Sequence, residues 1–111
     1  MNIFSNKGLI NTHFFYLVLI FLFSFFINFY YAKFGSFPID TFLHYDSSFR
    51  ILNNEYPIRD YWIVSGFIVD FLQSFFFKIL GVNWLAYTFH SSIFNSVISI
   101  FSYYFFLNLN L

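Results

Sequence analysis

A long apolar block near the start of the chain, FFYLVLIFLFSFFINFYY, most constrains how this sequence can fold. It covers 14–31, and its only polar interruptions are Ser24 and Asn28. At a rise of about 1.5 Å per residue, a helix of this length crosses a hydrocarbon core of about 30 Å. The block is longer than the apolar core of a signal peptide, and no small-residue cleavage site follows it. We therefore predict an uncleaved transmembrane helix over 14–34, preceded by a tail at 1–13.

A second apolar block extends over 84–107 and carries no formal charge along its whole length. His90, Asn95 and several serines interrupt it, and such groups in membrane helices usually hydrogen-bond to neighbouring helices. Trp84 stands at its start, where an indole ring prefers the headgroup level. The sequence therefore predicts a second transmembrane helix over 84–107, with 108–111 as a short C-terminal end.

The composition places both blocks in a membrane protein. Of 111 residues, 59% are hydrophobic and only 9% are charged, which leaves too few polar side chains to cover a soluble domain. A formal net charge of zero gives no basic patch for nucleic acid, and the absence of cysteine excludes disulfides and thiolate chemistry. We expect an all-α, multi-pass integral membrane protein, with two transmembrane helices joined by a long loop over 35–83 that contains short amphipathic or juxtamembrane helices.

The segment 66–80, GFIVDFLQSFFFKIL, allows two interpretations. As a third span it would place Asp70 near the middle of the bilayer, at a cost of about 2.5–3.5 kcal/mol on insertion scales. As a helix in the interface plane it would set a polar stripe opposite an apolar face, and its short length favours this interpretation. Ser65 and Gly81 are the predicted cap residues. The polar stripe comprises Gly66, Asp70, Gln73, Ser74 and Lys78.

A shorter amphipathic helix is predicted over 41–52, after Pro38 ends an extended entry. Asp40 occupies its predicted N-cap position, where a carboxylate accepts hydrogen bonds from the first free amides. Asn53 and Asn54 close the helix, because Asn tolerates the left-handed conformation that a helix end needs. Asp40 therefore has a plain structural interpretation, against which any chemical role has to be weighed.

Within this helix, His44 and Asp46 have equally plain interpretations. His44 lies one turn after Asp40 on the same face, and a lone histidine there is more often a polar surface residue than a ligand. Asp46 precedes Arg50 by four residues, the favourable order for an ion pair on a helix. No spacing of His, Asp and Glu indicates a metal site, and the sequence leaves the cofactor unknown.

The turn that follows, NNEYPIRDYW, carries Arg59 and Asp60 beside Tyr61 and Trp62. It fits a membrane-surface loop whose aromatic rings and arginine lie at headgroup level. It also fits a phosphate site, because guanidinium groups bind phosphate through paired hydrogen bonds and Arg50 is close in sequence. Both interpretations stay open at this point.

Taken in order, these motifs resemble the first extracytoplasmic loop of GT-C membrane glycosyltransferases. The similarity is to the branch that includes protein mannosyltransferases, which use a polyprenyl-phosphate sugar. That loop typically opens with an acidic motif, continues through a helix end and a P-Y-R-D-F-type turn, and closes with F-F-K-L-F-G. Asp40 matches the acidic position, and Thr41 replaces the Glu that usually follows it. The other matching residues are Ser48, Ile51, Leu52 and Asn54 at the helix end, Tyr56, Pro57, Arg59, Asp60 and Tyr61 in the turn, and Gly66, Phe76, Phe77, Lys78 and Gly81 after it.

The resemblance implies a function. The chain would be the N-terminal portion of a longer enzyme that transfers a sugar from a polyprenyl-phosphate donor to an acceptor, and would be inactive alone. Asp40 would be the catalytic base that deprotonates the acceptor. Holding the donor phosphate or ordering the loop would fall to Arg50, Arg59 and Asp60, and the secondary candidates are His44, Asp46 and Asp70.

The resemblance also implies a location. It puts the protein in the bacterial inner membrane with a cytoplasmic N-terminus, and its partners would be membrane lipid, a lipid-linked sugar donor and further membrane helices. The count of basic residues favours the opposite orientation, because Lys7 alone precedes the first apolar block and four basic residues lie within 33–78. The rival interpretations are a small non-enzymatic membrane protein or subunit whose loop binds a partner, and a truncated remnant without activity.

Overall fold

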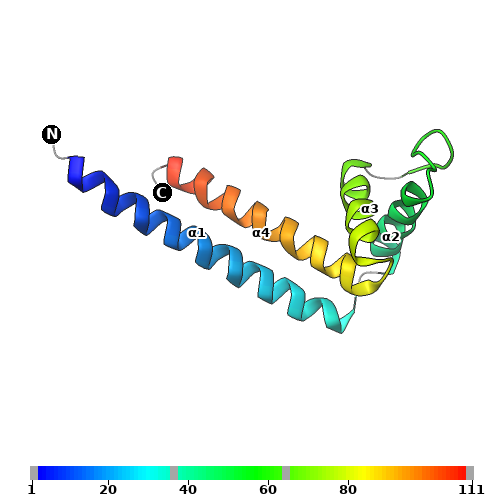
Figure 1. Ribbon diagram of the computed structural model, residues 1–111, viewed down its shortest axis with the longest axis horizontal. Coiled ribbons are helices and arrows are strands. Elements are labelled where there is room, and N and C mark those ends of the chain that lie inside the picture. Colours follow the sequence, from blue (N-terminus) through cyan, green and yellow to red (C-terminus); the bar gives the residue numbers. More distant parts are fainter. Residues whose placement is uncertain (1–2, 36–37, 64–65, 110–111) are drawn as a thin grey trace. The chain divides into compact units, whose positions relative to one another are not determined.

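The computed structural model describes residues 3–35, 38–63 and 66–109, and the regular structure there is helical (Figure 1). The predicted all-α fold is confirmed for these residues. The chain forms two compact units, one of residues 1–30 and 92–111 and the other of Tyr31–Ser91. The elements are α1 (Ile3–Tyr31), a 3-10 turn (Ala32–Phe34), α2 (Pro38–Leu52), α3 (Ile68–Leu80) and α4 (Trp84–Asn108).

The two long helices differ in how apolar they are. Of the described helices, α1 alone is both long and apolar enough to cross a membrane, over Thr12–Tyr31. It also extends back to Ile3, well before the predicted start at residue 14. α4 is 25 residues long, and its many serines make it the less apolar of the two.

In the first unit, polar side chains of α1 and α4 meet each other. The hydrogen-bonded positions run in opposite directions along the two helices, which therefore pair antiparallel. Large apolar side chains such as Phe23 of α1 and Phe101 of α4 are exposed. Lipid favours this distribution, because helices in a bilayer associate through polar and small groups rather than through apolar ones. The bonded pairs are His13–Tyr103 at 2.8 Å, Ser24–Ser99 at 3.0 Å and Asn28–Asn95 at 3.0 Å.

In the second unit, α2 and α3 pack against each other through a largely polar interface. Asp70 and Gln73 of α3 are 2% and 1% exposed, whereas Phe77 and Ala86 are the only buried hydrophobic residues in the described part of the chain. The Phe77 ring packs on Tyr45 of α2, with ring centroids 4.9 Å apart. The other buried polar residues of the two helices are Ser47, Ser48 and Ser74.

The outward face of α3 is apolar. The polar stripe predicted over 66–80 exists, but its central residues are buried on the side of α3 that packs on α2, while Gly66 and Lys78 at its two ends are exposed. A soluble domain has the opposite distribution, with apolar groups inside and polar groups outside. The exposed apolar residues of α3 are Ile68, Val69, Phe71, Leu72, Phe75, Ile79 and Leu80.

The start of α2 differs from the prediction. Pro38 is the first residue of the helix, which begins before the predicted start at Thr41, so Asp40 lies inside the first turn and is not the N-cap. The entry that precedes the helix lies outside the described residues. Proline favours the first helical position, because its fixed φ suits a helix and its missing N–H would be unpaired there anyway. Asp40 still lies at the positive end of the helix dipole, where a carboxylate is favourable.

The other helix ends are set by local backbone geometry. Asn54, with φ 66°, takes the left-handed conformation predicted after α2, and Gly81, with φ 82°, follows α3. Phe67 stands at the N-cap of α3 without a side-chain cap, and the predicted cap Ser65 lies outside the described residues. Asn83 caps α4, because its Oδ1 accepts a hydrogen bond from the Ala86 amide at 2.8 Å.

Candidate functional site

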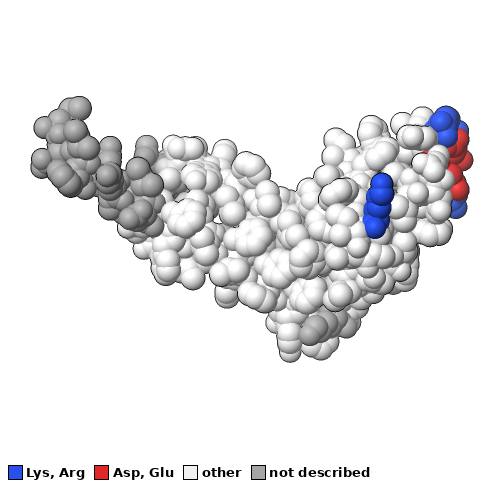
Figure 2. Space-filling model, viewed as in Figure 1, with Lys and Arg blue, Asp and Glu red and all other residues white. Residues whose placement is uncertain are grey.

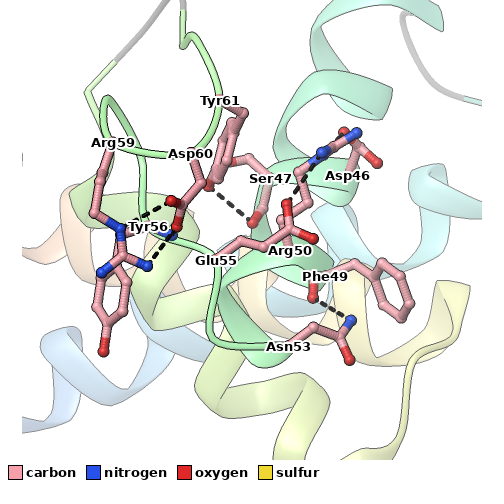
Figure 3. Close-up of polar contacts among 10 residues, drawn as sticks. All are labelled: Asp46, Ser47, Phe49, Arg50, Asn53, Glu55, Tyr56, Arg59, Asp60 and Tyr61. Carbon is pink, nitrogen blue, oxygen red and sulfur yellow. Dashed lines mark hydrogen bonds and ion pairs between the residues drawn. The ribbon is translucent and has the colours of Figure 1, made fainter.

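The turn between α2 and α3 is held together by Asp60 (Figure 3). The Tyr56 amide donates a 2.7 Å hydrogen bond to this carboxylate, and the Arg59 guanidinium donates two, at 2.8 and 2.6 Å. The side-chain hydrogen bonds from Arg59 and then the Tyr56 amide lower the pKa of Asp60 to about 2. The carboxylate therefore stays ionised, and the turn stays closed, through neutral and mildly acidic pH.

The same turn contains one strained residue. Ile58 has φ 73°, a left-handed conformation that β-branched side chains rarely adopt. Its amide donates to the Tyr61 carbonyl at 2.9 Å, and the Asp60 amide donates to the Tyr56 carbonyl at 2.9 Å. The turn is therefore determined by several contacts at once, which is what allows such strain to persist.

Arg50 forms a second charged group on the end of α2. Its Nε donates to Asp46 at 2.7 Å and its Nη1 to Glu55 at 3.1 Å, while the guanidinium lies over the Tyr61 ring, 5.4 Å from its centroid. The predicted ion pair between Asp46 and Arg50 is thus confirmed. In Figure 2 acidic and basic side chains gather in one patch, and a separate basic side chain lies apart from it on the same face. Both guanidinium groups, those of Arg50 and Arg59, already face carboxylates, so a phosphate would have to compete for them.

His44 is not the lone surface histidine that its sequence position suggested. Its Nδ1 lies 2.6 Å from Oδ1 of Asp70, and the side chains are 28% and 3% exposed. A carboxylate only accepts hydrogen bonds, so an ionised Asp70 fixes the proton of a neutral imidazole on Nδ1. Nε2 of His44 is then left as a hydrogen-bond acceptor.

A second hydrogen-bonded pair lies beside the first. The Ser47 hydroxyl and the Tyr61 hydroxyl are 2.8 Å apart, and the Tyr61 hydroxyl also donates to the Ser47 carbonyl at 3.2 Å. Burial raises the pKa of Tyr61, so its phenol keeps the proton that it donates. The two pairs line a pocket of about 50 Å³, with Asp46 and Trp62 also among its lining residues.

The structure brings together only part of the predicted site. His44, Asp46 and Asp70 share the pocket, whereas Asp40 is exposed in the first turn of α2 and does not line it. Arg59 and Asp60 form the turn instead. Tyr61 and Trp62, seen in the sequence only as neighbours of that turn, join the pocket.

The site has no metal-binding arrangement in the described part of the chain, where no three His, Cys, Asp or Glu side chains gather closely enough to hold an ion. The chain matches no protein-family model, no curated protein and no solved structure. The resemblance to membrane glycosyltransferases therefore rests on the ordered motifs alone.

Proposed function

We propose that the chain is an integral membrane component in which α1 and α4 span the bilayer and α2 and α3 lie in its surface. The observation that carries this proposal is the distribution of side chains in the Tyr31–Ser91 unit. The α2–α3 interface buries Asp70 and Gln73, while α3 turns Phe75 and Ile79 outward. An amphipathic helix in the interface plane buries such a face in lipid.

The hydrogen bonding of α4 supports its role as the second span. Its serines lower its apolar character, but several of their hydroxyls bond to carbonyls of the preceding turn, as Ser96 does to Ser92 at 2.7 Å. Ser99 bonds both to the Asn95 carbonyl and to Ser24 of α1. A hydroxyl satisfied within the helix pair is compatible with the hydrocarbon core, where no water is present to satisfy it.

For the chemistry, we propose that the surface unit serves a membrane glycosyltransferase that uses a polyprenyl-phosphate sugar, in a bacterial inner membrane and with the N-terminus cytoplasmic. Asp40 would be the base, since it is exposed on the first turn of α2, open to an acceptor at the membrane surface. The guanidinium groups of Arg50 and Arg59 would leave their present carboxylate partners and bind the donor phosphate. Asp60 would order the turn, and the hydrogen bonds that it accepts there support that role.

One observation favours the second candidate, a non-enzymatic membrane protein whose loop binds a partner. Both guanidinium groups are already paired with carboxylates, and the pocket of about 50 Å³ encloses far less than a whole sugar phosphate. Pockets that enclose small-molecule ligands usually measure about 300–1,000 Å³. An enzyme built on this unit would therefore need further membrane helices to close its cavity.

The membrane arrangement is testable by labelling single cysteines with an impermeant thiol reagent in sealed vesicles. We expect Asn53→Cys and Lys78→Cys to react from one side, and Ser5→Cys and Asn108→Cys from the other, because each long helix crosses once. The chain has no cysteine of its own, so each label reports one site. Reaction of Asn108→Cys from the side of Asn53→Cys would show that α4 does not span, and reaction of Lys78→Cys from the opposite side would show that α3 does.

A further inference from the structure

Trp62 is the most exposed large hydrophobic side chain among the described residues, at 84%, and it lines the pocket that holds the His44–Asp70 pair. An indole ring so exposed has two common uses at a membrane surface. It can lie at headgroup level as an anchor, or it can offer its face to a ligand. The polar groups beside it decide between these uses, because an anchor needs only lipid and has no use for a hydrogen-bonding pocket.

The pocket has the size of one hydroxyl-bearing substituent of a ligand. One water molecule needs roughly 10–15 Å³ by the same kind of measure, so about 50 Å³ accommodates a few water-sized groups and no ring. A ligand ring would have to stay outside, at the rim where Trp62 lies. The pocket would then bind a substituent of that ring.

The pocket walls offer several hydrogen-bond acceptors to a ligand hydroxyl. In a neutral His44 whose Nδ1 donates to Asp70, Nε2 is a hydrogen-bond acceptor. Tyr61 donates its proton to the Ser47 carbonyl, and the Ser47 hydroxyl then donates to the Tyr61 hydroxyl, so both hydroxyl oxygens remain as acceptors. Asp46 adds a carboxylate that is 61% exposed at its side chain. Carbon-bound hydrogens on one face of a pyranose ring carry a slight positive charge, and they pack well on the negative face of an indole.

We propose that Trp62, His44 and Asp70 form a subsite for a pyranose sugar, with the ring packed on Trp62 and one hydroxyl arm hydrogen-bonded to His44. Asp70 is a positioning residue, because it acts through the tautomer of His44. This deepens the proposed function and rests on it for the source of the sugar, which would be the head of the lipid-linked donor. Nothing in the resemblance assigns these roles to His44, Asp70 or Trp62.

Fluorescence of Trp62 tests the subsite without requiring any transfer reaction. Trp84→Phe leaves Trp62 as the only tryptophan of the full chain, which is placed in phosphatidylcholine nanodiscs because sugar detergents would compete. We expect methyl α-mannoside to change the emission saturably, with a Kd of about 1–100 mM for so small a ligand. Glycerol, which has hydroxyls but no ring face, should give no saturable change.

His44→Gln is the informative variant. Glutamine can still donate to Asp70 and preserve the packing of α2 on α3, but it offers no ring nitrogen to the sugar, so affinity should fall about tenfold. Lys78→Gln, exposed on α3 and outside the pocket lining, should bind like the parent. Absence of a saturable response in the parent, or equal affinity in His44→Gln, would overturn the subsite. So would a spectral shift produced only by anionic phosphatidylglycerol vesicles, which would make Trp62 a membrane anchor.

These outcomes are independent of the proposed enzyme. Sugar binding without transferase activity in native membranes would retain the subsite and remove the transferase. Transferase activity unchanged by His44→Gln, together with no sugar response, would retain the transferase and remove the subsite.

Discussion

Replacing Asp40 with Asn is expected to lower the rate of sugar transfer by about 10²–10⁴-fold, the usual contribution of a general base. The structure sharpens this expectation, because Asp40 lies within the first turn of α2 and is not its N-cap. Loss of its charge costs the helix only the favourable interaction with the dipole, about 0.3–1 kcal/mol. A large loss of rate would therefore report chemistry and not folding.

The assay needs membranes of cells that express the protein from its native gene, supplied with a panel of polyprenyl-phosphate sugars. Glu55→Gln is the matched control, since it removes the same charge and Glu55 does not line the pocket. Its ion pair with Arg50 is exposed, and an exposed ion pair is worth only about 0–1 kcal/mol. Equal transfer rates in Asp40→Asn and the parent, at equal expression, would remove the base role of Asp40.

Replacing Asp70 with Leu is expected to destabilise the packing of α2 on α3 by about 2–3 kcal/mol, because it leaves His44 without its partner in a largely buried interface. This loss of stability is smaller than the loss expected for a fully buried pair, since the His44 side chain remains 28% exposed. Unfolding of the chain by dodecyl sulfate in mixed micelles, followed by tryptophan emission, measures the loss.

A double substitution separates this pair from a general intolerance of position 70. When both partners become apolar, no polar group is left unsatisfied, and such replacements are often nearly neutral. We therefore expect His44→Leu with Asp70→Leu to recover most of the stability that Asp70→Leu loses. Losses that simply add in the double variant would show that the two side chains are not energetically coupled.

Much of the fold could be predicted, because it depends on local patterns. The apolar blocks, the helical spacing from Asp70 to Lys78 and the left-handed Asn54 were all readable along the chain. The direction in which the polar stripe faces could not be predicted from the sequence. In water a polar stripe turns outward, and only the partner helix shows that this one turns inward onto α2.

Contacts of the candidate site within one helix could be predicted from the sequence, whereas contacts between its elements could not. Asp46 and Arg50 are four residues apart, so helix geometry alone pairs them. His44 and Asp70 lie on different helices, and no spacing along the chain links them. The pocket beside Trp62 has the same origin, because Ser47 and Tyr61 meet only once the turn folds back on α2. The helix patterns therefore predict the elements, while the contacts between elements create the site.

We propose that the Tyr31–Ser91 unit contacts lipid on one side, because its polar groups pack inside and the apolar face of α3 lies outside. Spin labels at Phe75 and Ile79 of α3, with Asn53 as the matched position after α2, test it in nanodiscs. We expect Phe75 and Ile79 to collide more with oxygen, which concentrates in lipid, and Asn53 to collide more with a water-soluble nickel chelate. Greater access of the nickel chelate than of oxygen at Phe75 and Ile79 would contradict the account.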